Sequence, residues 1–143
     1  VAASFRYASP MLGIGRLHLA ADLFVRLHNL DNQVGALGGD SGLRGYPSSA
    51  FFGAHELQLH AEYRTQGLEL LTNLFGLAVF WDAGDAFDDL EFGDLAVKNS
   101  VGIGLRWLIP QFNRSVIRLD WGFPLQSSRP FPGSVSLAFE QAF

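Results

Sequence analysis

The residues Gly39–Gly42 read Gly-Asp-Ser-Gly, which matches the start of the nucleophile sequence of trypsin-type serine proteases. Such a serine needs a histidine base, and in that class the histidine precedes the serine along the chain. Here the one Ala-His pair, Ala54-His55, follows the serine, and Leu43 stands where the protease sequence has glycine. The chain, at 143 residues, is also shorter than that fold requires. We therefore interpret Ser41 as part of a glycine-rich loop without catalytic function.

Three other sets of residues suggest chemistry only at first sight. Gly102-Ile103-Gly104 resembles half of a dinucleotide fingerprint, but no helix pattern follows it, so we expect glycines that thin one face of a strand. The acidic stretch from Asp82 to Asp94 lacks the spacing of a calcium-binding EF-hand and fits a solvated loop. The four histidines show no metal-ligand spacing, and the chain has no cysteine. The sequence therefore predicts no catalytic residue, no metal site and no cofactor.

Composition limits the class of protein further. Hydrophobic residues make up 48% of the chain, which is too much for a disordered segment, and the net charge of −4 does not suit a nucleic-acid binder. No window approaches the run of about 20 apolar residues that a transmembrane helix requires. The apolar residues are instead divided into short pieces with polar residues between them, so strands must provide the framework.

Alternation of apolar and polar residues with a period of two predicts these strands. In the clearest case Leu57, Leu59, Ala61 and Tyr63 alternate with polar residues on either side. Similar patterns cover 17–27, 54–64, 71–82, 101–107, 117–123 and 135–143, with a partial strand near 4–7. Most of these runs are close to the length of about 9–11 residues with which a tilted strand crosses a bilayer.

Charged residues fall regularly on one face of these strands, and large aliphatic residues and tryptophan fall on the other. A soluble β-sandwich would not usually separate them so regularly, whereas a membrane barrel must, because a midplane Arg or Lys on the lipid face costs about 2–4 kcal/mol. Two connections are tight, at 64–69 and 110–114, and two are long, at 29–53 and 84–99. Short turns at one end and long loops at the other are typical of outer-membrane barrels. The prediction is an all-β, antiparallel transmembrane barrel.

Four motifs in order resemble the superfamily that contains BamA, TamA, FhaC and the Sam and Toc barrels of organelles. The first is the loop Gly38-Gly39-Asp40-Ser41-Gly42-Leu43-Arg44-Gly45-Tyr46, in which Leu43 replaces the usual Val or Ile before Arg-Gly-Tyr. The second, Phe80-Trp81-Asp82-Ala83-Gly84, is similar to the F-x-D-x-G motif of the family. The third is Gly102–Pro110, followed by Arg118-Leu119-Asp120. The fourth is a C-terminal barrel signal formed by Val135, Leu137, Phe139 and Phe143, with Gln141 where an apolar residue is common.

The resemblance implies how the loop is held. In the family the arginine loop folds into the barrel lumen, and its arginine pairs with the aspartate of F-x-D-x-G. These residues correspond to Arg44 and Asp82 here, with Gly38, Gly39, Gly45 and Tyr46 as the remainder of the loop motif. Alternation independently places Asp82 in the polar phase, opposite to Trp81. Other charged residues in that phase are expected to extend the network: Glu56, Glu62, Arg106, Arg118 and Asp120.

The resemblance also implies a function. It predicts a protein of the Gram-negative outer membrane that inserts, assembles or secretes other proteins by opening a lateral seam or a pore, with no chemical step. Its partners would be outer-membrane lipid, the barrel assembly machinery during biogenesis, and a client polypeptide. No nucleic acid is expected as a partner.

About seven strands are fewer than the smallest usual closed barrel contains. We therefore expect residues 1–143 to be a C-terminal barrel segment, with 29–53 as its lumen-inserting loop. Two alternatives stay open. The barrel could anchor or export a fused passenger such as a patatin-like lipase, or it could be a small independent barrel, closed by an eighth strand from Val1–Tyr7 or by a second copy. POTRA-like modules upstream would favour a machine that inserts or secretes proteins. A G-x-S-x-G hydrolase domain upstream would favour the fused passenger.

Overall fold

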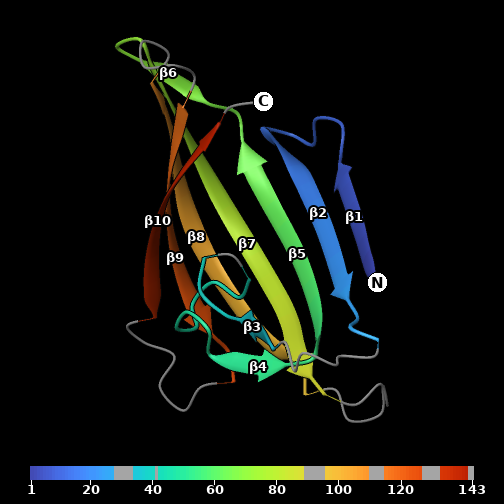
Figure 1. Cartoon of the computed structure of the whole chain (residues 1–143). Helices are drawn as coiled ribbons and strands as arrows, with labels where there is room; N and C mark the ends of the chain where they lie inside the picture. Colours follow the sequence, from blue (N-terminus) through green and yellow to red (C-terminus); the bar gives the residue numbers. More distant parts are fainter. Residues whose placement is uncertain (28–33, 41, 89–95, 110–114, 127–132, 142–143) are drawn as a thin grey trace.

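A computed structural model describes residues 1–27, 34–40, 42–88, 96–109, 115–126 and 133–141, and the regular elements in these ranges are all β-strands. Seven long strands form one antiparallel sheet in the order β1-β2-β5-β7-β8-β9-β10 (Figure 1). They are β1 Ala2–Ala8, β2 Gly15–Phe24, β5 His55–Thr65, β7 Asn73–Phe87, β8 Lys98–Ile109, β9 Ser115–Pro124 and β10 Ser134–Gln141. The short strands are β3 Gly35–Leu37, β4 Phe51–Gly53 and β6 Leu68–Leu70. The prediction of an all-β, antiparallel architecture is confirmed.

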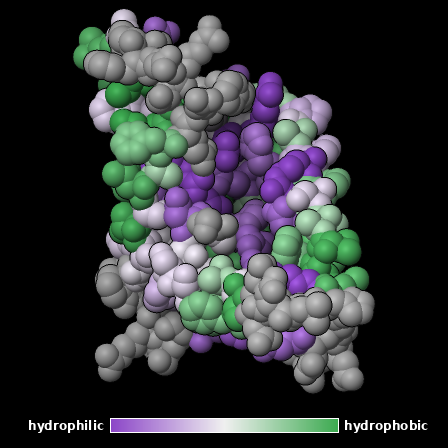
Figure 2. All heavy atoms as spheres, viewed as in Figure 1, coloured by the Kyte–Doolittle hydropathy of each residue, from purple (hydrophilic) through white to green (hydrophobic). Residues whose placement is uncertain are grey.

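Alternation along the strands gives the sheet an apolar outer face and a polar inner face. On β7 every second side chain from Leu77 to Trp81 is exposed, whereas Ala78, Phe80 and Asp82 between them are buried. The residues in register on β8 and β9 follow the same rule. Figure 2 looks onto the inner face, where hydrophilic residues gather in the centre and hydrophobic ones lie to either side. An outer face that exposes large aliphatic side chains suits contact with hydrocarbon.

The two ends of the sheet differ in the length of their connections. At the upper end in Figure 1, which we call the short-turn end, β1 joins β2 through residues 9–14, and β5 joins β7 through residues 66–72, which include β6. At the opposite, long-loop end, residues 25–54 connect β2 to β5, and 88–97 connect β7 to β8. The predicted loop from Gly84 to Asn99 is therefore wrong at both of its ends. The reason is that Gly84 pairs with Lys98, and Asp85 and Phe87 continue the pairing of β7 with β5.

The chain between β2 and β5 folds over the inner face of the sheet. β3 and β4 pair as a small antiparallel hairpin, and Figure 1 shows the segment between them in front of β7 and β8. This segment has a core of its own, in which Leu37, Leu43 and Tyr46 are buried and Phe51 and Ala86 pack against them. Ala86 belongs to β7, so the core joins the segment to the wall of the sheet.

The sheet is not closed within the described residues, where β1 and β10 are its two edges. Six antiparallel pairings separate β1 from β10, so these two strands run in the same direction. They therefore have the wrong relative direction to pair antiparallel with each other. The same holds for β10 of one copy and β1 of a second copy inserted with the same orientation. Antiparallel closure requires an odd number of additional strands between the two edges.

Candidate functional site

Arg44 lies at the centre of the most deeply buried set of charges that the structure describes. Its Nε donates to Asp82 Oδ2 and its Nη2 to Asp82 Oδ1, both at 2.7 Å, which is a two-pronged guanidinium–carboxylate pair. The backbone N–H of Arg44 also donates to Asp82 Oδ2, at 3.3 Å. The Arg44 and Asp82 side chains are 6% and 0% exposed. Paired hydrogen bonds of this kind fix the direction of the arginine as well as its distance.

Two further carboxylates and an aromatic ring complete the environment of Arg44. Its Nη1 donates to Glu62 Oε2 at 2.6 Å and to Asp120 Oδ2 at 3.1 Å, so strands β5, β7 and β9 each supply one partner. The guanidinium carbon lies 3.5 Å from the centroid of the Phe80 ring. A guanidinium is attracted to such a ring face, and the ring also shields the pair from water. One side chain of the loop thereby links three strands of the wall.

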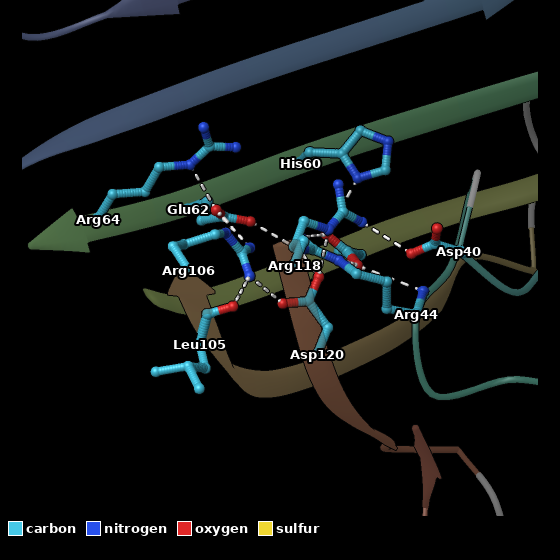
Figure 3. A network of polar contacts seen from close by, with 10 residues as sticks. Asp40, Arg44, His60, Glu62, Arg64, Leu105, Arg106, Arg118 and Asp120 are labelled. Atoms are coloured by element: carbon cyan, nitrogen blue, oxygen red, sulfur yellow. Dashed lines mark hydrogen bonds and ion pairs between the residues drawn. The ribbon is translucent and has the colours of Figure 1, made fainter. Parts of the chain in front are cut away.

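The surrounding arginines balance these carboxylates (Figure 3). Arg106 pairs with Glu62 at 2.8 Å and also with Asp120. Arg118 pairs with Asp120 at 2.8 Å, while Arg64 pairs with Glu62 at 2.6 Å. Asp40 of the loop receives a bond from Arg118 at 2.8 Å, and His60 Nδ1 lies 3.0 Å from Asp82. We call this set the arginine cluster: Asp40, Arg44, His60, Glu62, Arg64, Asp82, Arg106, Arg118 and Asp120.

Burial and charge act in opposite directions on Arg44. Burial lowers the pKa of its guanidinium, but the hydrogen bonds and negative charges of Asp82 and Glu62 outweigh burial and raise that pKa above the ordinary arginine value. The side chain therefore stays charged, and its paired carboxylates compensate the desolvation. A buried charge matched in this way fixes one conformation even where its net contribution to stability is small.

Glycines allow the loop backbone to reach the wall. Gly45 adopts a φ of 96°, and a Cβ placed on it would lie 2.8 Å from the backbone carbon of Gly122 on β9. A Cβ on Gly122 would in turn lie 2.6 Å from the Gly45 nitrogen. The contact is thus backbone against backbone, with no flexible side chain to give way. Gly38 and Gly39 also adopt positive φ, 128° and 75°, at the bend where the loop turns inward.

The glycines of β8 have a related use. A Cβ on Gly102 would lie 2.3 Å from the ring of Phe80, and one on Gly104 would overlap the carboxylate of Asp120. The expected thinning of the inner face by these glycines is confirmed. Space left by two absent side chains is occupied by the ring and the carboxylate that hold Arg44.

Tyr46 is a second anchor at the long-loop end. Its hydroxyl lies 3.1 Å from the Asn99 carbonyl oxygen and 3.0 Å from Gln126 Oε1, and its ring packs edge-on against Phe51 at 5.2 Å. Burial raises the pKa of the Tyr46 phenol, so the hydroxyl keeps its proton and can donate. The loop is therefore also attached to the first residues of β8 and to the segment that follows β9.

The structure brings together most, but not all, of the residues that the sequence singles out. Glu62, Arg106, Arg118 and Asp120 lie in the arginine cluster with Arg44 and Asp82. Glu56 does not join it and instead pairs with Arg26 at 3.4 Å, towards the long-loop end. Val135, Leu137 and Phe139 are exposed, while Ser41 and Phe143 lie outside the described residues.

Sequence reasoning missed four members of this environment: Phe80, His60, Asp40 and Arg64. Phe80 carried a signal, because it is a large apolar residue in the polar phase of β7. His60 and Arg64 are in the polar phase of β5, but that phase does not reveal which residues lie beside Arg44. Asp40 lies in the loop, where no periodicity exists to place it.

The inner face also encloses space beside the loop. A cavity of about 510 Å³ lies between the first strands and the arginine cluster, with Arg6, His18, His60 and Arg64 among its lining residues. Among the described residues no group of His, Cys, Asp and Glu side chains is arranged to hold a metal ion. The loop therefore lies beside a cavity on the inner face of the sheet.

Comparison with known proteins identifies the family. Residues 32–134, which are most of the chain, match the family model of the Omp85 superfamily domain. The resemblance inferred from the loop and the three later motifs is confirmed at this level. No curated protein matches the chain. In the part of the chain that the structure describes, no helix has the length and apolarity to cross a membrane.

Proposed function

Since the chain belongs to the Omp85 superfamily of outer-membrane proteins that insert or secrete other proteins, we propose that its sheet is one part of a barrel wall and holds the arginine loop in the lumen. In this proposal the loop within residues 29–53 is a fixed internal element that shapes the path through the barrel. The protein acts by moving a seam or a pore and performs no chemical step, as members of the family generally do.

The observation that carries this proposal is the arginine cluster. A loop that packed on the inner face only by its apolar core could slide along it, because apolar contacts are non-directional. Arg44 instead makes directional bonds to β5, β7 and β9, and Gly45 lies against the backbone of β9. These contacts support a loop that stays in place until several strands move together, which links loop position to the shape of the wall.

A movable seam is favoured by the free strand edges. In lipid each backbone polar group needs a partner, so an open edge must be covered by another strand. On β10 the outward side chains Val135, Leu137 and Phe139 are 61–72% exposed, which suits lipid on that side. We propose that the edge of β10 is one side of the seam, and that its partner is an antiparallel strand of the barrel or of a client.

The first alternative is an anchor or conduit for a fused passenger. It would use the same sheet and the same loop, so the architecture fits it as well as it fits a machine that inserts or secretes proteins. The small barrel made of two copies is less well supported, because β1 and β10 run in the same direction. Mass measurement in detergent tests it: a closed two-copy barrel would appear as a stable dimer, and the proposal expects none.

The proposal is tested with the variant Arg44→Ala of the full-length protein, for which protease cleavage of the loop and channel conductance are measured. We expect Arg44→Ala to increase protease cleavage within residues 38–46 and to change channel conductance in liposomes, while the strand signal in circular dichroism stays unchanged. The matched control is Arg6→Ala, which removes an exposed arginine of the same inner face. Equal cleavage and equal conductance in wild type and Arg44→Ala would refute the role of the loop.

A further inference from the structure

A second, smaller pocket lies at the short-turn end of the inner face. Arg64 of the arginine cluster lines this pocket, whereas Asp82 does not. The pocket has a volume of about 220 Å³, and we call it the rim pocket. The residues that line it come from β2, β5 and the turns beside them: Met11, Gly15, Arg16, His18, Arg64, Thr65 and Gln66. Two of these are arginines, and none is a carboxylate.

The strand register places the two arginines directly opposite each other. Arg16 on β2 is the cross-strand partner of Arg64 on β5, and His18 is the partner of Glu62. Like charges that face each other across a sheet destabilise it, so an uncompensated pair at this position calls for a counter-charge. Arg16 is exposed, and within the described residues it makes no hydrogen bond or ion pair.

The nearest carboxylate is already shared. Glu62 accepts from Arg44 at 2.6 Å through one oxygen, and from Arg64 at 2.6 Å and Arg106 at 2.8 Å through the other. One negative charge thus compensates parts of three guanidinium groups, and none of it is directed to Arg16. The rim pocket therefore retains a positive charge although the whole chain carries −4.

The rim pocket also presents hydrogen-bond donors. Arg64 binds Glu62 through its Nε, which leaves its two terminal nitrogens for the pocket. The Thr65 hydroxyl oxygen accepts from the Leu77 N–H at 2.9 Å, so its hydrogen is available to donate. The Gln66 backbone N–H is bonded to the Ile14 carbonyl at 2.7 Å, which holds the two turns together around the pocket. Donors without a matching acceptor, on a fixed frame, are what an oxyanion requires.

We propose that the rim pocket binds a water-soluble oxyanion, a phosphate or a carboxylate group, between Arg16 and Arg64. Its volume exceeds by several-fold the share of about 30 Å³ that one water occupies, so an anionic group and accompanying water fit. The pocket opens on the inner, polar face and shares His18 and Arg64 with the larger cavity, so a solute in the lumen reaches it. The site does not depend on whether the protein inserts or secretes clients.

The test is binding by isothermal titration to the protein in a nonionic detergent. The probes are inorganic phosphate and a short glutamate-containing peptide, with the same peptide carrying glutamine as the uncharged control. We expect saturable binding of at least one charged probe, which then identifies phosphate or carboxylate as the ligand. Arg16→Gln should weaken this binding by about tenfold or more. Arg16→Lys should weaken it by less, because lysine keeps the positive charge but cannot form the two-pronged hydrogen bond of a guanidinium.

Arg6→Gln is the matched control, because Arg6 lies on the same face but is already paired with Asp22. We expect it to change the affinity by about twofold or less. Arg16 is exposed and, within the described residues, makes no hydrogen bond or ion pair with the arginine cluster, so we expect the Arg16 variants to fold. Absence of binding by both charged probes, equal binding of the glutamine peptide, or equal losses in Arg16→Gln and Arg6→Gln would overturn the proposal.

Discussion

Arg44–Asp82 and Arg6–Asp22 are the same chemical pair on the inner face of the same sheet. Their closest nitrogen–oxygen distances, 2.7 Å and 2.9 Å, are almost equal. Their exposures are not: the side chains of the first pair are 6% and 0% exposed, and those of the second 60% and 29%. Exposed pairs typically contribute about 0–1 kcal/mol, whereas removing one partner of a buried pair costs about 3–5 kcal/mol. Contact distance alone therefore says little about the importance of an ion pair.

The difference originates in the chain around each pair. Arg6 belongs to β1, an edge strand whose residues are all exposed, so water competes for its guanidinium. Arg44 lies against strands in which glycines stand where larger residues would block the loop. Phe80 covers one side of its guanidinium. At the edge of the sheet this interaction is exposed to water. At the centre it is buried and holds the loop against the strands, and we call the Arg44–Asp82 pair the latch.

The largest expected effect is that of Arg44→Ala. The substitution leaves Asp82, Glu62 and Asp120 close together without their shared cation. We expect a loss of about 3–5 kcal/mol in the free energy of unfolding, measured by urea titration of the protein in lipid bilayers. Arg44→Lys should recover only part of it, because lysine cannot form the two-pronged bond. A loss below 1 kcal/mol for Arg44→Ala would place this pair in the same class as the exposed one.

Gly122→Ala is expected to have the next largest effect. Its Cβ would lie 2.6 Å from the Gly45 nitrogen and 2.7 Å from the Arg44 carbonyl carbon, so the loop backbone must shift. We expect a loss of about 1–3 kcal/mol and faster protease cleavage of the loop. The control is Gly76→Ala on β7, where the nearest atom to a new Cβ is 3.5 Å away, an ordinary contact distance. Equal effects of the two substitutions would show that the close approach of loop and β9 has no consequence.

Tyr46→Phe should have a smaller effect. It removes only the hydroxyl that lies close to the Asn99 carbonyl and to Gln126. A single hydrogen bond contributes about 0.5–1.5 kcal/mol, and we expect a loss of that size together with faster amide hydrogen exchange at Asn99. Tyr63→Phe, which removes an exposed hydroxyl bonded to the Leu12 carbonyl, is the matched control and should leave exchange at Asn99 unchanged.

The smallest expected effect is that of Arg6→Ala. Its pair with Asp22 is exposed and Ser4 also donates to Asp22, so the carboxylate keeps a partner. We expect a change of about 0–1 kcal/mol that disappears at high salt, measured by the same urea titration. A loss as large as that of Arg44→Ala would remove the distinction between the two pairs.

Much of the sheet could be predicted from the sequence, because alternation with a period of two directly reports which side chains share a face. It predicted seven strands and placed Asp82 on the inner face. It did not predict that β7 continues to Phe87, since Ala83, Gly84 and Asp85 break the apolar pattern there. Pairing with β5 and β8 extends the strand in spite of that local signal.

The composition of the candidate site could be predicted only in part, because alternation gives the face of the sheet on which a residue lies but not its position along the strand. Glu56 and Glu62 are both in the polar phase of β5, yet they lie about 20 Å apart along the strand at 3.3 Å per residue. Glu62 faces the loop, whereas Glu56 lies near Arg26. The path of the loop itself has no periodicity, and only the family resemblance indicated that Arg44 would turn inward.

The most direct test of the latch is a double-mutant cycle on Arg44 and Asp82. The variants are Arg44→Gln, Asp82→Asn and the two combined, each unfolded with urea in lipid bilayers. A direct, buried bond predicts a coupling free energy of about 1–3 kcal/mol, so that the double variant loses much less than the sum of the single ones. Losses that add to within about 0.5 kcal/mol would show that the two residues act independently, and would contradict the account of Arg44 as the latch that holds the loop.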